Sequence, residues 1–91
     1  MKFDVLVEVR LRVGISDPQG ATIEKALPVL GFESVYGVRA GKAFRLTVEA
    51  PDIVEGRLVV EDLCRRLLTN PVIEDSIVTL NVQAESEKVI S

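Results

Sequence analysis

The feature that most constrains the fold is a stretch of alternating residues near the start of the chain, residues 3–13. Apolar side chains occupy every second position: Phe3, Val5, Val7, Val9, Leu11 and Val13. The positions between them are mostly charged, with Leu6 as the exception. A period of two over this length predicts a long strand with one buried face and one solvated face. Such a strand is typical of an antiparallel or mixed sheet that is covered on one side.

A helix is predicted over residues 18–30. Asp17 is a good N-cap, and Pro18 suits the first helical position because its missing N–H would have no partner there. Pro28 removes one backbone bond from the last turn, and Gly31 is placed for a left-handed C-terminal cap. The expected buried stripe consists of Ala21, Ile23, Ala26, Leu27 and Leu30.

Two more strands are predicted in the middle of the chain, over residues 32–39 and 43–50. The second run alternates Phe44, Leu46 and Val48 with polar residues. The three residues between the runs, 40–42, are few enough for a hairpin loop. In that loop we expect Gly41 to supply a positive φ.

A second helix is predicted over residues 52–69, opened by Pro51 and Asp52 and stopped by Asn70 and Pro71. Its expected buried stripe consists of Val60, Leu63, Cys64, Leu67 and Leu68. A last strand over residues 76–83 follows, with Val78, Leu80 and Val82 on one face.

The predicted order is therefore β-α-β-β-α-β in the α+β class. This is the ferredoxin-like arrangement, an antiparallel sheet with two helices on one face. We expect a single domain over residues 1–83 and a polar C-terminal tail over 84–91. The 91-residue length excludes two independent cores.

Composition narrows the function more than the fold does. The chain has no histidine, which removes the commonest general acid/base and argues against a zinc site. The net charge of −3 and the scarcity of aromatic residues argue against nucleic-acid binding. We expect no membrane span, no signal peptide and a cytoplasmic location. We therefore predict no catalytic residues and no metal ligands, and Cys64 is expected to be a buried, inert thiol.

Three segments are candidates for an interface. The first is the start of the first predicted helix, with Asp17, Pro18, Gln19 and Gly20. The second is the predicted hairpin, with Arg39, Gly41 and Lys42, and the third is the connection to the last strand, with Asn70, Pro71, Glu74 and Asp75. Each segment also has a purely structural explanation: a helix cap, an edge hairpin protected by charge, and a helix stop followed by solvated acids.

Two hypotheses follow for these charges. The basic hairpin, which also carries Arg45, would dock on an acidic or phosphate-bearing partner surface. Glu74 and Asp75 would form an acidic counterpart elsewhere on the molecule. The segment over residues 37–42 also has a faint likeness to a phosphate-binding loop, but its spacing is one residue short and it lies between two predicted strands rather than before a helix.

Four segments in this order carry a family resemblance: residues 14–20 (GISDPQG), 30–32 (LGF), 38–42 (VRAGK) and 64–75 (CRRLLTNPVIED). With them, the chain closely resembles the PurS family, the small subunit of phosphoribosylformylglycinamidine (FGAM) synthase, from about residue 3 to residue 82. The family often has an aromatic residue where this chain has Ser76.

The resemblance implies a role in purine biosynthesis without chemistry of its own. A large synthetase subunit (PurL) binds ATP and formylglycinamide ribonucleotide, and a glutaminase subunit (PurQ) releases ammonia. The small subunit supports their assembly and the passage of ammonia between them. The chain itself would bind no cofactor, whereas the whole complex uses ATP, magnesium and glutamine.

We also expect self-association, as a homodimer or homotetramer, because so small a domain gains stability by burying surface against copies of itself. The alternative from another functional class is a small-molecule-sensing domain of the ACT type. Such domains share the predicted β-α-β-β-α-β order and bind an amino acid at a dimer interface.

Overall fold

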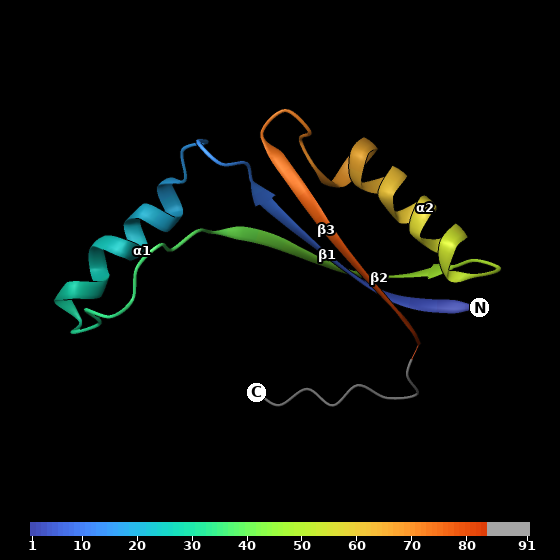
Figure 1. The fold of residues 1–91 in the computed structure, drawn as a ribbon, viewed down its shortest axis with the longest axis horizontal. Helices are drawn as coiled ribbons and strands as arrows, with labels where there is room; N and C mark the ends of the chain where they lie inside the picture. The colour runs from blue at the N-terminus through green and yellow to red at the C-terminus, as the bar shows by residue number, and fades with distance from the viewer. Residues whose placement is uncertain (84–91) are drawn as a thin grey trace.

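A computed structural model describes residues 1–83, and the predicted tail over 84–91 lies outside the described residues. The elements follow in the order β-α-β-α-β (Figure 1): β1 (Lys2–Leu11), α1 (Pro18–Val29), β2 (Gly41–Glu49), α2 (Ile53–Leu63) with a π-helical turn η1 (Cys64–Leu68), and β3 (Glu74–Val82). The predicted α+β class, with an antiparallel sheet and two helices, is confirmed.

The sheet has three strands in the order β2-β1-β3, and both pairings are antiparallel. The alternating segment forms the central strand, as its pattern requires. Its odd-numbered side chains from Phe3 to Val9 are buried, and the even-numbered ones lie on the open face. The core comprises Phe3, Val5, Val7, Val9, Val48, Ala50, Val60, Cys64 and Leu80.

Helix α2 covers one face of this sheet. Asp52 caps it by accepting a hydrogen bond from the Glu55 N–H at 2.9 Å, and Val60 and Cys64 point into the core. Gly56 lies directly against the sheet, since a Cβ there would come within 3.5 Å of Phe3 and Val48 side-chain atoms. The buried Cys64 predicted from the sequence is confirmed.

The predicted burial of Leu67 is wrong, because 74% of this residue is exposed. The Thr69 N–H donates to the Cys64 carbonyl five residues back, which is the π-helical bond of η1. Each residue of a π turn advances by a smaller angle than in an α-helix. The side chain that faces the core is therefore that of Leu68, which packs against it, and not that of Leu67.

The predicted strand over residues 32–39 is not formed, so within residues 1–83 β2 has no hairpin partner on that side. This segment has a turn at residues 33–34 and no regular secondary structure over residues 35–39, and it runs back alongside α1 (Figure 1). We call it the return segment. Gly41 belongs to β2, and the positive φ angles are at Gly14, Gly31 and Gly37. Gly41 is needed for another reason: a Cβ there would lie 2.7 Å from the Val9 carbonyl oxygen of the neighbouring strand.

Helix α1 does not lie on the sheet with α2 but projects beyond the end of β1 (Figure 1). Its C-terminal cap at Gly31 is confirmed, with φ +88° and a hydrogen bond from the Phe32 N–H to the Leu27 carbonyl. The stripe predicted to be buried is largely uncovered, and Ile23 is 44% exposed. We call residues 14–40, which contain α1 and the return segment, the arm.

Candidate functional site

The three candidate segments come together at one end of the sheet, where the arm joins it. The starts of α1, β2 and β3 surround a hollow of about 290 Å³ whose floor is Val9 and Leu11 of β1. The candidate residues among its lining are Asp17, Pro18, Gln19, Gly41, Lys42 and Glu74. We call this place the three-loop site.

Asp17 is a nearly buried carboxylate in the three-loop site, with only 5% of its side chain exposed. Its Oδ1 accepts the Gly20 N–H at 3.0 Å, which caps α1, and its Oδ2 accepts the Ala40 N–H at 2.8 Å. The hydrogen bonds from Gly20 and Ala40, with the nearby Arg39 guanidinium, lower the pKa of Asp17 below its ordinary value of 3.8. The carboxylate therefore links the beginning of α1 to the beginning of β2.

Gly20 is required by the same contact. A Cβ at this position would lie 2.5 Å from the Asp17 Oδ2 atom and 2.7 Å from the Val38 carbonyl oxygen. The Asp-Pro-Gln-Gly segment is thus a capping unit, as its structural explanation proposed, and its Asp also binds the chain as it returns to the sheet.

The two cations of the second segment are paired with carboxylates of the other two segments. Lys42 lies 3.6 Å from Glu74, and Arg39 lies 3.9 Å from Asp17. The hypothesis that Glu74 and Asp75 lie elsewhere on the surface, away from the cations, is wrong. The antiparallel pairing of β1 with both β2 and β3 brings the starts of β2 and β3 to the same end of the sheet.

The connection before β3 is ordered by local hydrogen bonds. The Asn70 side chain accepts the Val72 N–H at 3.1 Å, while the Glu74 carboxylate accepts the Asn70 N–H at 2.7 Å. Pro71 offers its carbonyl to Arg12 at 2.9 Å, and Arg12 also pairs with Asp75 at 3.3 Å. This loop is therefore held in one shape and attached to the end of β1.

Two residues that hold this end of the molecule were missed by the sequence analysis, Arg12 and Glu24. The Glu24 carboxylate accepts the Val38 N–H at 2.7 Å, so α1 binds the return segment at a second point. A signal for Glu24 was available: it follows Asp17 by seven residues and thus lies on the same side of the helix. No comparable signal identifies Arg12.

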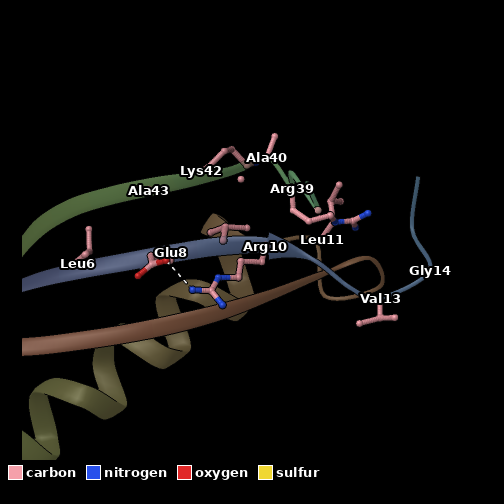
Figure 2. A pocket seen from close by; sticks show the side chains of 13 residues that line it. Leu6, Glu8, Arg10, Leu11, Val13, Gly14, Arg39, Ala40, Lys42 and Ala43 are labelled. Atoms are coloured by element: carbon pink, nitrogen blue, oxygen red, sulfur yellow. Dashed lines mark hydrogen bonds and ion pairs between the residues drawn. The ribbon is translucent and has the colours of Figure 1, made fainter. Parts of the chain in front are cut away.

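A wider, open depression of about 970 Å³ lies beside the three-loop site on the uncovered face of the sheet. Figure 2 shows Glu8 and Arg10 of β1 within it, joined by an ion pair of 3.0 Å, with Lys42 and Ala43 on the neighbouring strand. Leu6 contributes an apolar side chain to the same depression. Among residues 1–83 no group of three or more Cys, Asp and Glu side chains is placed to hold a metal ion.

The three-loop site offers ordered loops, paired charges and small apolar areas, which are features that suit a protein interface. No helix of residues 1–83 is both long and apolar enough to span a bilayer.

Comparison with known proteins gives one consistent result. The family model for PurS, phosphoribosylformylglycinamidine (FGAM) synthase, matches residues 4–83. The PurS subunit of Methanothermobacter thermautotrophicus is 42% identical over 81 residues, which are 89% of this chain and 95% of that protein. The matches give no support to the ACT-type alternative.

Solved structures agree with the sequence matches. A crystal structure of Methanocaldococcus jannaschii PurS, one of the subunits of formylglycinamide ribonucleotide amidotransferase in the purine biosynthetic pathway, has a TM-score of 0.80 at 30% identity and covers 90% of this chain and 99% of its own. A PurLQS structure from Thermotoga maritima has a TM-score of 0.83 at 33% identity, covering 89% and 99%.

Proposed function

The chain belongs to the PurS family of FGAM synthase subunits, and on this premise we propose that it assembles with a glutaminase subunit and a large synthetase subunit of that enzyme. Its role there is to support assembly and the transfer of ammonia, with no catalytic step of its own. The observation that carries the proposal is the match to the Thermotoga maritima PurLQS structure over 89% of this chain.

The substrates and cofactors then belong to the whole complex. ATP, magnesium and glutamine are bound and used by the larger subunits, and the complex works in the cytoplasm. The absence of histidine from the chain favours this division of labour, because general acid/base chemistry at neutral pH most often uses that residue.

The three-loop site is the surface that we propose for docking on a larger subunit. It combines Asp17–Gly20, Arg39–Lys42 and Asn70–Asp75, the three segments chosen from the sequence. Asp17 and Glu24 fix the first two segments to each other, and Asn70 and Glu74 fix the third. Rigid loops favour docking because little conformational entropy is lost on association.

Self-association is the second part of the proposal, as a homodimer or a homotetramer. Its support is the shape of the single copy, whose radius of gyration is 16.7 Å. A compact domain of this length has a radius of gyration of about 12 Å. A chain this extended leaves apolar surface uncovered, and a second copy is the partner that is always present.

The proposal is tested by reconstituting FGAM synthesis from the purified synthetase and glutaminase subunits, with and without this chain. We expect glutamine-dependent turnover to require the chain. Turnover with ammonium chloride in place of glutamine should persist without it, because the large subunit then needs no ammonia transfer. Equal glutamine-dependent turnover with and without the chain would refute the proposal.

The docking surface is tested by the double substitution Arg39→Ala with Lys42→Ala. We expect weaker association with the larger subunits, and added salt should weaken association of the wild type in the same way, since screening shortens the reach of exposed charges. The control is Arg65→Ala with Arg66→Ala, which removes two exposed cations of η1 that pair with Asp62 instead of with residues of the three-loop site. If both double variants associate equally, the docking surface lies elsewhere.

A further inference from the structure

Strand β3 has one edge that bonds no other strand within residues 1–83, because the sheet order is β2-β1-β3. Two hydrogen bonds at the ends of the β1–β3 pair show which backbone groups face this edge. The Arg12 N–H donates to the Ile73 carbonyl at 2.8 Å. The Gln83 N–H donates to the Lys2 carbonyl at 3.1 Å. Bonded and non-bonded positions alternate in an antiparallel pair, so the even-numbered residues of β3 turn their N–H and C=O groups toward the free edge.

The segment at this edge has a composition that favours pairing with further strands. Residues 76–82 (SIVTLNV) contain no charged residue, no glycine and no proline. Short segments of this kind pair readily with strands of other molecules when their edge is open. The opposite edge strand differs, because β2 carries Lys42, Arg45 and Glu49. Strand β3 therefore depends on another element to protect its edge.

Helix α2 provides that protection through Arg57. The Arg57 guanidinium donates from Nη1 to the Val78 carbonyl at 3.2 Å. Val78 is the middle residue of β3 and is even-numbered, so this carbonyl faces the free edge. The neighbouring Gly56 lets the helix approach the sheet, since a Cβ there would lie 3.3 Å from the Leu80 side chain. Helix α2 also runs beside β3 in Figure 1, which places the side chain of Arg57 within reach of the edge.

We propose that Arg57 blocks the addition of a further strand to β3. Its guanidinium occupies the Val78 carbonyl, which an incoming strand would have to bond at the centre of its ladder. It also places a charge where that strand would lie. The partner that it excludes is β3 of a second copy, because two uncharged segments 76–82 would otherwise meet with no charge or proline to oppose them. This role of Arg57 does not depend on the function proposed above, because the edge is open to pairing in any assembly that leaves β3 uncovered.

The proposal is tested with Arg57→Ala in the full chain, by following aggregation through light scattering and thioflavin T fluorescence. The control is Arg65→Ala, which removes the same charge from η1, where the guanidinium pairs with Asp62. We expect Arg57→Ala to aggregate about tenfold faster than Arg65→Ala, because a hydrogen bond from a charged donor is worth about that factor in an equilibrium. Arg57→Lys keeps a charged donor and should aggregate at close to the wild-type rate.

Two further substitutions separate edge pairing from a loss of stability. The Ser76 N–H also faces the free edge, so Ser76→Pro removes no hydrogen bond to β1, while a proline at an edge opposes strand addition. Thr79→Lys instead adds a charge to the same segment at an exposed position. Each, combined with Arg57→Ala, should return the aggregation rate to that of the wild type. Neither can do so by restoring the hydrogen bond of Arg57, which stays absent.

The possible outcomes decide the role of Arg57. Faster aggregation of Arg57→Ala that either of the two further substitutions reverses supports the proposal. Aggregation of Arg57→Ala at the rate of Arg65→Ala overturns it. Faster aggregation that neither substitution reduces also overturns it, because the pairing then arises elsewhere in the chain. The reconstitution assay decides the role in FGAM synthesis separately from all of these results.

Discussion

The two halves of the molecule differ in how completely one copy satisfies its own sequence pattern. In the sheet and α2, the side chains that the pattern predicts to be buried, such as Val7 and Val60, are buried. In the arm, side chains with an equally regular pattern, such as Ile23 and Leu30, are exposed. Periodicity therefore predicts which side chains form an apolar face, but it does not show whether that face is buried within the same copy.

The largest expected effect is in the half that is complete. Phe3→Ala removes a side chain that is 1% exposed and touches the position of Gly56 on α2. We expect a loss of roughly 3–5 kcal/mol in the free energy of unfolding, measured by urea denaturation. The control is Leu67→Ala, whose exposed side chain should be worth under ~0.5 kcal/mol. Equal losses for the two variants would show that the core is not where the structure has it.

The next effect concerns the contact between the central strand and β2. Gly41→Ala places a Cβ 2.7 Å from the Val9 carbonyl oxygen, and backbone cannot yield as a flexible side chain would. We expect a loss of about 1–3 kcal/mol, as for other substitutions that overfill a packed site. Amide exchange should accelerate at the start of β2. Ala43→Ser, at an exposed position of the same strand, should have little effect, and an unchanged Gly41→Ala would mean that the strands lie farther apart.

Much of the fold could be predicted from the sequence, because local rules determine it. The central strand follows from alternation, α2 from its stripe, and the caps at Asp17, Asp52 and Gly31 from the chemistry of helix ends. The prediction of a strand over residues 32–39 was wrong for a physical reason. Strand propensity indicates that a segment fits a pleated sheet, but a strand forms only where a free edge lies beside it.

The candidate site was predicted in parts but not as a whole. The three segments were candidates on their sequence alone, but their meeting at one end of the sheet was not predicted. The pairing of Lys42 with Glu74 depends on strands that are far apart in sequence and meet only through β1. The prediction of a positive φ at Gly41 was wrong, because a glycine can be required by the close approach of a neighbouring strand as well as by a turn. Leu67 was misplaced because the stripe assumed α-helical spacing through η1.

A smaller and more local effect is expected in the arm. Asp17→Asn keeps an oxygen that can accept the Gly20 N–H, but its amide group cannot accept the Ala40 N–H. We expect faster motion of the amides of residues 38–40, seen in NMR relaxation, with little change in the melting of the sheet. Unchanged relaxation at Ala40 would show that Asp17 does not hold the arm.

The same contact gives the arm a pH dependence. Because the pKa of Asp17 is lower in the folded chain than its ordinary value of 3.8, its carboxylate stabilises the arm above that pH. This stabilisation is lost as the pH falls through the lower, folded value. The Ala40 amide signal should therefore shift during acid titration in the wild type, and it should stay constant in Asp17→Asn. A shift of equal size in both proteins would assign the titration to another group.

The smallest effect is expected where the two halves meet, at the ion pair of Lys42 and Glu74. Lys42 is largely exposed, so a double-mutant cycle with alanine at both positions should give a coupling of under ~1 kcal/mol, reduced further by salt. Glu74→Ala alone should cost more than Lys42→Ala, because the Glu74 carboxylate also accepts the Asn70 N–H at 2.7 Å. The exposed pair of Arg65 and Asp62 provides the reference cycle. A single-mutant loss of about 3 kcal/mol at Lys42, which is typical of a broken buried pair, would mean that this end of the molecule is covered in solution.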